Sequence, residues 1–406
     1  MDRTIVGIDV GTTKICTLVG EVDPEGGLRI VGVGVTPSRG IRKGVVVDVK
    51  ECTSAIAESM QKAERVSGYQ IVSAYVGLAG AHVDGINNRG VVAINQSSRR
   101  GVQAHDVDRA LEAAQAIALP HNRQVLHVIP RGFTIDGDDG VRDPIGMQAY
   151  RLEVEAHIVT GATSSIHNLV KCVQANGIEI DALVLEPLAS GEAVLTSTER
   201  EMGVVLADIG GGTTDIAIFI EGSIWHSVVL PTGGEQLTND IAIGLQTPFD
   251  AAEEIKIKYG QARPQSVAPD EEIDILSFGE GGRQRISRQF LAQIIQARME
   301  ETLELILREI KRSGYDGLLP AGVVLTGGTA ELAALRGLAR DVLGLPVRIG
   351  APQDLRGLVD TLNSPAFSTS VGLLEWGLTH DAPRAVPERR NGQGKLWNWL
   401  KVFLPE

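Results

Sequence analysis

Two distant parts of the chain place apolar runs and glycine turns in the same order. The first part has an apolar run over 4–8, a turn from Asp9 to Thr13 and a strand-like run over 15–19. The second has a run over 203–207, a turn from Asp208 to Asp215 and a run over 216–220. Further β-rich runs follow at 28–35 and 223–230. This punctuation predicts strand, tight turn, strand in both parts, and therefore an internal repeat.

Two other segments have small residues at helical spacing. The first, 185–194, begins at Glu186–Pro187 and is followed by alanine, serine and glycine. The second, 367–377, has Ser368, Ser370 and Gly372 on one helical pattern. Proline is favoured at a helix start, and small side chains allow helix axes to approach closely. We predict a pair of crossing helices that joins two lobes.

The segment between the repeats predicts a compact α+β insertion. Strand-like runs lie at 91–94, 124–129, 131–135 and 151–159, and a helix carries the apolar stripe Val107, Ala110, Leu111, Ala114 and Ile117. His127 and His157 fall in these strands. We expect both to be half-buried structural residues and not catalytic ones.

Composition and charge narrow the class of protein. A chain of 406 residues exceeds one usual hydrophobic core, and its 47 glycines with 43% hydrophobic residues are typical of a glycine-rich α/β protein. The net charge of −13 argues against nucleic acid as a partner. No run reaches the roughly 20 apolar residues of a spanning helix. The widely spaced Cys16, Cys52 and Cys172 and the absence of a signal peptide predict a reducing cytoplasm, without a metal site built from side chains alone.

Both turns carry residue types that bind phosphate. Glycine lets backbone amides point into one concavity, and threonine adds a hydroxyl donor. One such turn is also typical of an ordinary hairpin, but its repetition favours a site. No P-loop pattern is present. We assign phosphate binding to Gly11, Thr12, Thr13 and Lys14 in the first turn, and to Gly210, Gly211, Gly212, Thr213 and Thr214 in the second.

An aspartate heads each turn. Phosphate repels a carboxylate, so Asp9 and Asp208 are better suited to holding the water molecules around Mg²⁺ or to orienting an attacking water. We assign both as catalytic and, through water, as metal-binding residues. The sequence thus predicts ATP and Mg²⁺ as cofactors, with slow turnover at most.

A third glycine turn predicts the nucleoside end of the site. Gly327 and Gly328 follow an apolar run over 321–325 and precede a predicted helix start. In the helical segment 250–258, Glu253 and Lys256 lie one turn apart and are assigned to the ribose or adenine. The alternative for this pair is an ordinary i, i+3 ion pair on the surface.

The C-terminal segment differs from the rest of the chain. Residues 381–393 hold two prolines, a glycine and three arginines and predict a linker. The next residues predict an amphipathic helix of about 16 Å, too short to span a bilayer but able to lie in its surface. The membrane-binding candidates are Lys395, Leu396, Trp397, Trp399, Leu400, Lys401, Phe403 and Leu404. The local excess of Arg and Lys suits anionic lipid. The alternative is a terminal helix that docks on the protein's own core or on a partner.

The order phosphate turn, connecting helix, phosphate turn, adenosine turn, connecting helix resembles the actin, heat-shock chaperone and sugar kinase superfamily. This resemblance implies an α/β, actin-like two-lobed ATPase fold with duplicated mixed sheets, an inserted α+β subdomain and a C-terminal amphipathic helix. It also implies that Glu186 lies near the attacking water or the magnesium, as in the chaperone ATPases. The alternative for Glu186 is a surface glutamate at a helix start.

With the insertion and the tail included, nearly the whole chain resembles the FtsA family of bacterial cell-division proteins. That resemblance implies self-assembly into actin-like filaments and attachment of FtsZ to the membrane. It also implies recruitment of later division proteins through the insertion. The expected location is peripheral, on the cytoplasmic face of the membrane at the division site. A pilus-assembly ATPase of the same branch and a small-molecule kinase are the alternatives.

The resemblance also implies a division of the chain. The first lobe takes 1–83 and 164–195, with the insertion at 84–163. The second lobe takes 196–230, a small subdomain at 231–303 and a part with the adenosine turn at 304–355. A return helix at 356–380, the linker at 381–393 and the amphipathic helix at 394–406 complete the chain.

Overall fold

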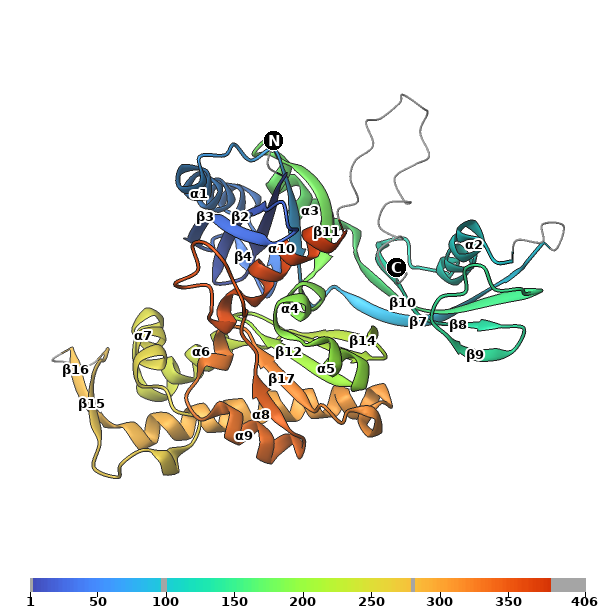
Figure 1. Ribbon diagram of the computed structural model, residues 1–406. Helices are drawn as coiled ribbons and strands as arrows, with labels where there is room; N and C mark the ends of the chain where they lie inside the picture. Colours follow the sequence, from blue (N-terminus) through green and yellow to red (C-terminus); the bar gives the residue numbers. More distant parts are fainter. Residues whose placement is uncertain (1–2, 96–100, 279–281, 381–406) are drawn as a thin grey trace.

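Two lobes stacked one above the other form the body of the protein in the computed structural model, and a third part extends to one side (Figure 1). The structure describes residues 3–95, 101–278 and 282–380. The predicted linker and amphipathic helix over 381–406 lie outside these residues.

Each lobe contains a mixed sheet of the same topology. The first-lobe sheet has the order β11-β6-β1-β2-β3, and the second-lobe strands run β18-β17-β12-β13-β14. In each sheet the first strand pairs antiparallel with the second and parallel with the crossover strand. The strands of the first lobe are β1 (Arg3–Val10), β2 (Lys14–Val22), β3 (Leu28–Pro37), β6 (Ser73–Leu78) and β11 (Glu179–Leu185). Those of the second lobe are β12 (Val204–Ile209), β13 (Thr214–Ile220), β14 (Ser223–Leu230), β17 (Val323–Thr326) and β18 (Val347–Ile349). The predicted internal repeat is therefore confirmed as a duplicated sheet.

Helices cover both sheets. In the first lobe, α1 (Val49–Ser67) packs on β2 and β3, with α3 (Thr163–Gln174) beside it. In the second lobe, α6 (Gly234–Leu245) contacts both α7 (Phe249–Tyr259) and α8 (Arg288–Ser313), and α8 contacts α9 (Leu335–Leu343). Smaller elements are the hairpins β4 (Ile41–Arg42) with β5 (Val45–Val46) and β15 (Glu272–Leu276) with β16 (Arg283–Ser287), the helix α5 (Ser197–Met202), and the 3₁₀ turns η1 (Pro264–Ser266), η2 (Asp316–Leu318), η3 (Gly328–Glu331) and η4 (Pro365–Phe367). Separate apolar clusters form the cores of the two lobes and of the insertion.

The insertion is an α+β unit whose sheet continues that of the second lobe. It consists of β7 (Asp84–Ala93), α2 (Ala104–Gln115), β8 (Arg123–Ile135), β9 (Asp138–Val141) and β10 (Arg151–Ala162). The pair Val228 and Asp84 joins β14 to β7. The sequence predicts two strands, 124–129 and 131–135, on either side of Pro130, but the structure has the single strand β8. A β-bulge in the pairing with the partner strand β10, between Glu155 and Ala156, accommodates the proline.

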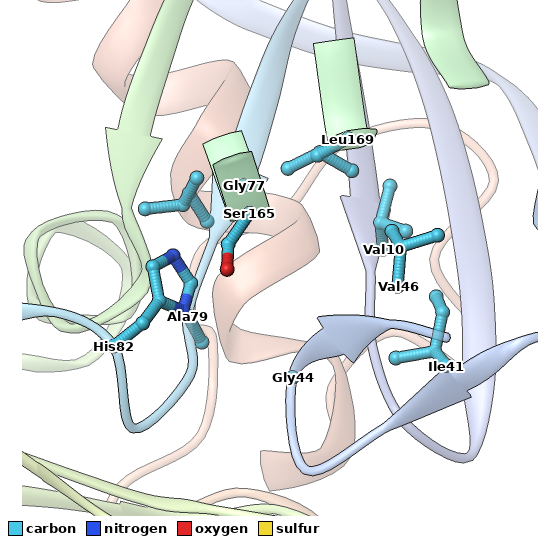
Figure 2. A pocket seen from close by; sticks show the side chains of 10 residues that line it. Val10, Ile41, Gly44, Val46, Gly77, Ala79, His82, Ser165 and Leu169 are labelled. Carbon is cyan, nitrogen blue, oxygen red and sulfur yellow. The ribbon is translucent and has the colours of Figure 1, made fainter. Parts of the chain in front are cut away.

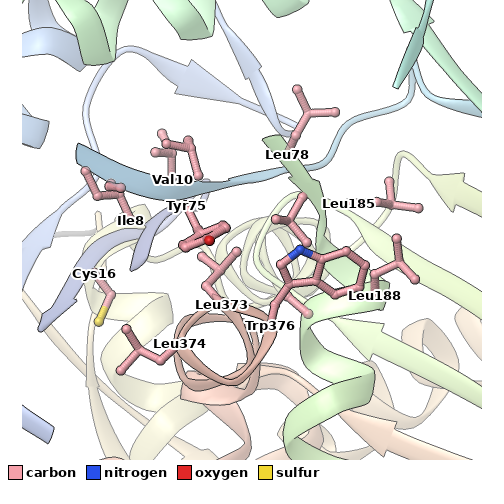
Figure 3. Close-up of a cluster of buried hydrophobic side chains, with 14 of the residues drawn as sticks. Ile8, Val10, Cys16, Tyr75, Leu78, Leu185, Leu188, Leu373, Leu374 and Trp376 are labelled. Atoms are coloured by element: carbon pink, nitrogen blue, oxygen red, sulfur yellow. The ribbon is translucent and has the colours of Figure 1, made fainter. Parts of the chain in front are cut away.

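Two helices cross between the lobes, as expected. These are α4 (Glu186–Val194) and α10 (Ser368–His380), and their surroundings form a continuous apolar cluster (Figure 3). A Cβ atom added at Gly372 would lie 1.8 Å from the Ala189 carbonyl oxygen. Only a glycine permits this approach, so the small residues set the distance between the two helices.

Two sequence expectations differ from the structure. His127 and His157 are fully buried and not half-buried, because the helical layer and β14 cover the strand faces on which they lie. The His127 Nε2 accepts from the Leu185 amide (3.1 Å), and burial lowers the pKa of His127 to about 4. After the third turn the chain makes the 3₁₀ turn η3, so that the α-helix starts only at Leu335. Within the described ranges, no helix combines the length and the apolar character that crossing a bilayer requires.

Candidate functional site

The two predicted turns are closed by equivalent hydrogen bonds. The Gly11 amide donates to the Lys14 carbonyl oxygen (3.1 Å), and the Gly210 amide donates to the Thr213 carbonyl oxygen (3.0 Å). Asp9 pairs with Cys16 across the first hairpin, as Asp208 pairs with Asp215 across the second. Both aspartates thus occupy the same position of the repeated unit. The residue opposite is a cysteine in the first hairpin and an aspartate in the second.

The turns of the two lobes touch each other. A Cβ atom on Gly211 would lie 2.4 Å from the Thr13 Cγ2, and one on Gly212 would lie 2.5 Å from the Thr12 Oγ1. Glycine is required at both positions for this contact. The glycine backbone of the second lobe's turn therefore lies against the threonine side chains of the first lobe's turn. Thr214 is directed elsewhere, since its hydroxyl donates to the Thr232 carbonyl oxygen (2.9 Å).

Asp9 and Asp208 converge on the first turn of α10. The Ser370 hydroxyl donates to Asp9 Oδ2 (2.7 Å), and the Thr369 hydroxyl donates to Asp208 Oδ2 (3.1 Å). Both carboxyls are buried. Adjacent residues of a single helix thus connect the two lobes' aspartates, and the sequence pattern gave no sign of Thr369 or of Ser370 as a partner.

Four carboxyl groups crowd this region. Burial raises the pKa of Asp208 to about 6 and that of Asp215 to about 8. The charge of Asp9 adds to the rise in the pKa of Asp208, and the charge of Asp208 adds to that of Asp215. Burial also raises the pKa of Asp9. The pKa of Glu186 lies well above its ordinary value because of burial and because of Asp215, Asp9 and Asp208. Asp215 Oδ1 is buried and has no hydrogen-bond partner among the residues that the structure describes.

The positive charge of Lys14 lowers the pKa of Asp9, Asp208 and Glu186. Its Nζ donates to the Ala366 carbonyl oxygen and lies 4.8 Å from the centre of the Phe367 ring. The side chain therefore lies against the segment that leads into α10.

The third turn adjoins the second. A Cβ atom on Gly327, where φ is 84°, would lie 2.4 Å from Asp208 Oδ1. The Thr329 hydroxyl in η3 donates to the Gly210 carbonyl oxygen (3.1 Å). Gly328 has more room, because in the described part of the chain the only atom within 4 Å of its Cβ position is the Ala366 Cβ at 3.7 Å.

Glu253 and Lys256 form an ion pair (2.6 Å) that is also anchored to α6. Lys256 Nζ donates to the Thr238 hydroxyl (2.9 Å) and to the Gly234 carbonyl oxygen (3.3 Å). Gly234 in turn donates its amide to the Gly210 carbonyl oxygen (2.9 Å). The pair is thus connected to the second turn through α6, beyond the ordinary i, i+3 contact.

Direct metal ligation by side chains has no support in the described ranges: no group of three or more His, Cys, Asp or Glu side chains there is arranged to hold an ion. Cys16, Cys52 and Cys172 are buried free thiols.

Comparison with known proteins gives the family. The family described as "Cell division protein FtsA" matches residues 205–372, and "SHS2 domain inserted in FTSA" matches residues 80–160. The cell division protein FtsA of Pseudomonas aeruginosa is 46% identical over 376 residues, which cover 93% of this chain and 89% of the relative. The chain belongs to the FtsA family. FtsA of Escherichia coli K12 is 36% identical over 406 residues, which cover 98% of this chain and 96% of the relative.

Solved structures share the fold of this FtsA family member. The "PilM-PilN type IV pilus biogenesis complex" has a TM-score of 0.67 at 17% identity and covers 92% of this chain and 98% of its own. MreB5 of Spiroplasma citri bound to ADP has a TM-score of 0.53 at 13% identity, covering 92% and 96%. These likenesses concern the fold alone, which is actin-like as expected. The family is that of cell-division proteins, and not of pilus-assembly ATPases or small-molecule kinases.

Proposed function

We propose that this chain binds ATP with Mg²⁺ between its lobes and uses the nucleotide as a switch for assembly in cell division. The observation that carries the proposal is the meeting of two buried aspartates, one from each lobe, on adjacent hydroxyls of α10. Contact between the two glycine turns supports it. The MreB5 protein of the same fold has a solved structure with ADP.

The phosphate end of the site is assigned to the two turns. Their glycines and threonines supply amide and hydroxyl donors, and Lys14 supplies a positive charge. A bound Mg²⁺ would neutralise phosphate charge. Asp9 and Asp208 would hold its water molecules, and Glu186 would orient an attacking water. We add Asp215 to this set, because its buried Oδ1 has no hydrogen-bond partner among the described residues and would accept from a water molecule of the metal.

The adenosine end is assigned to Gly327, Gly328, Glu253 and Lys256. At Gly327 the backbone lies so close to Asp208 and Ile209 that a Cβ atom would overlap them. Lys256 and Glu253 reach the second turn through α6. The two ends of the proposed site are thereby connected by backbone of the second lobe.

The metal assignment predicts the effect of Asp208→Asn. This isosteric change removes a charge that would hold magnesium water, so the Mg²⁺-dependent gain in ATP affinity should fall about 10- to 100-fold. Titration of a fluorescent ATP analogue with and without Mg²⁺ measures it. Asp270→Asn, at an exposed position, is the matched control. An unaltered Mg²⁺ dependence in Asp208→Asn would contradict the assigned role.

For the cell-division partners we propose three surfaces. FtsZ would dock on the small subdomain of the second lobe, where Ile257 and Phe278 are 75% and 74% exposed. Later division proteins would contact the insertion, where Tyr150 is 70% exposed. Anionic lipid on the cytoplasmic face of the membrane at the division site would bind the tail, Lys395 to Leu404. Further copies of the chain would assemble into an actin-like filament.

A further inference from the structure

A small hairpin next to the proposed nucleotide site has an unusual turn. The two strands β4 and β5 are joined by Lys43 and Gly44, whose φ values are 49° and 71°. Two successive residues with positive φ define a type I′ turn, for which Asn-Gly is favoured. A left-handed conformation is unfavourable for lysine, because its Cβ atom comes too close to the following carbonyl oxygen. Local stability therefore does not explain the choice of lysine at the tip.

One side of this turn rests on the glycine turns of both lobes. The Gly44 amide donates to the Thr12 Oγ1 (3.1 Å). A Cβ atom on Gly212 would lie 2.9 Å from the Lys43 Cα. The hairpin tip therefore contacts a residue of each phosphate turn, one from each lobe.

The charge of Lys43 is available on this side. The side chain is exposed and has neither a hydrogen bond nor an ion pair with any residue in the described part of the chain. Across the lobes, burial raises the pKa of Glu235 and Glu253 raises it further, whereas Arg42, Lys256 and Lys43 lower it. The Glu235 amide itself donates to the Gly211 carbonyl oxygen (2.8 Å). Lys43 is thus close enough to the second lobe for its charge to act on Glu235.

The other side of the hairpin contacts Gly80, in the segment 77–82 that leads into β7 and that we call the root of the insertion. A Cβ atom on Gly44 would lie 2.8 Å from the Gly80 Cα, and one on Gly80 would lie 3.0 Å from the Gly44 carbonyl oxygen. Gly80 has a φ of 125°, and β7 begins four residues later. Because the two backbones are in close contact, a movement of the hairpin requires a movement of this segment.

A small cavity separates the hairpin from the same root segment (Figure 2). Its volume of about 10 Å³ is bounded by Gly44 and Val46 on one side and by Gly77, Ala79 and His82 on the other. Both ring nitrogens of His82 are buried, and within the described ranges neither has a hydrogen-bond partner. The space holds about one water molecule, so the packing here is tight but polar.

We propose that Lys43 is a phosphate-sensing residue and that the hairpin transmits its state to the root of the inserted subdomain. The ammonium group pairs with the terminal phosphate of a bound nucleoside triphosphate. The resulting shift of the tip moves Gly44 against Gly80 and so reorients β7. The inference rests on the proposed function, since it requires a nucleotide at the two turns.

The test compares the affinities for ATP and ADP of wild type, Lys43→Asn and Lys43→Arg by equilibrium titration. Asn is favoured in the turn, so Lys43→Asn removes the charge without disturbing the hairpin. ATP should bind about tenfold more weakly to this variant, with ADP affinity within about twofold of wild type. Lys43→Arg should restore the ratio. Lys50→Ala, an exposed lysine on α1, should leave it unchanged.

Transmission is tested by hydrogen exchange in saturating ATP and in saturating ADP. Amides of 79–93 should exchange differently in the two states of wild type, and this difference should vanish in Lys43→Asn. A retained difference would overturn the transmission. If ATP affinity were unchanged in Lys43→Asn, or if ATP and ADP affinity fell equally, the phosphate contact would be overturned. If wild type bound neither nucleotide, the proposed function would fail together with this inference.

Discussion

At the scale of single residues, Asp215 distinguishes the two halves of the site. It occupies the position that Cys16 has in the first hairpin, opposite the leading aspartate. Its pKa of about 8 and that of Asp208 of about 6 lie above the ordinary value of 3.8, so the folded chain holds protons that the unfolded chain releases. Stability of the nucleotide-free protein should therefore fall as the pH rises from about 4 to about 8.

Asp215→Asn should remove part of this penalty. We expect the free energy of unfolding at pH 8 to rise by about 1–2 kcal/mol, with less gain at pH 5, because repulsion with Asp208 is lost. Mg²⁺-dependent ATP binding should weaken in the same variant. Urea denaturation at several pH values measures the first effect. Asp360→Asn, at an exposed position, serves as the control, and a pH-independent difference would refute the explanation by charge.

At the scale of elements, the crossing of α4 and α10 depends on one glycine. A Cβ atom at Gly372 would overlap the Ala189 carbonyl oxygen, and backbone cannot yield as a flexible side chain would. We expect Gly372→Ala to destabilise the protein by about 2–3 kcal/mol, since α10 must move away from α4. It should also weaken ATP binding, because Ser370 and Thr369 lie on the same helix.

The matched control for the crossing is Gly132→Ala in β8. A Cβ atom there meets no heavy atom within 4 Å, and its φ is not in the left-handed region. Its free energy of unfolding should stay within about 0.5 kcal/mol of wild type. Equal effects of the two substitutions in chemical denaturation would show that the close helix crossing is not the cause.

At the scale of the whole molecule, weak tails and nucleotide-dependent assembly should act together. A single short amphipathic helix binds a membrane weakly, whereas a filament presents many at once. We expect the full chain with ATP to form filaments on an anionic lipid monolayer in electron micrographs. A chain truncated after Gln393 should bind ATP equally well but not sediment with anionic vesicles.

Point variants of the tail sharpen that test. Trp399 is one of the apolar residues assigned to the membrane, whereas Val402 lies on the opposite, polar side of the predicted helix, so Trp399→Ala should reduce vesicle binding at least about tenfold and Val402→Ala should not. Sedimentation of the truncated chain with anionic vesicles at the level of the full chain would exclude the membrane role of the tail.

Sequence reasoning reached the local features of the site. Asp9, Gly11, Asp208 and Gly210 are recognisable because a strand, a tight turn and a strand are consecutive in the chain. It missed Thr369, Ser370 and Asp215, and it gave Lys43 no role. Serine and threonine at a helix start are common, and their contact with an aspartate more than 150 residues away depends on how α10 docks.

The sequence by itself determined the duplicated strand-turn-strand units, the crossing helices, the actin-like class and the resemblance to the FtsA family. The units and the helices follow from hydrophobic periodicity and from glycine positions, which act over short distances along the chain. The class and the family come from the resemblance of the ordered segments to known proteins. Only the tertiary structure decided that the two turns touch, that four carboxyl groups share one buried region and that the hairpin at Lys43 joins the site to the insertion. Those contacts arise from packing between segments far apart in the chain, where burial and backbone approach set the chemistry.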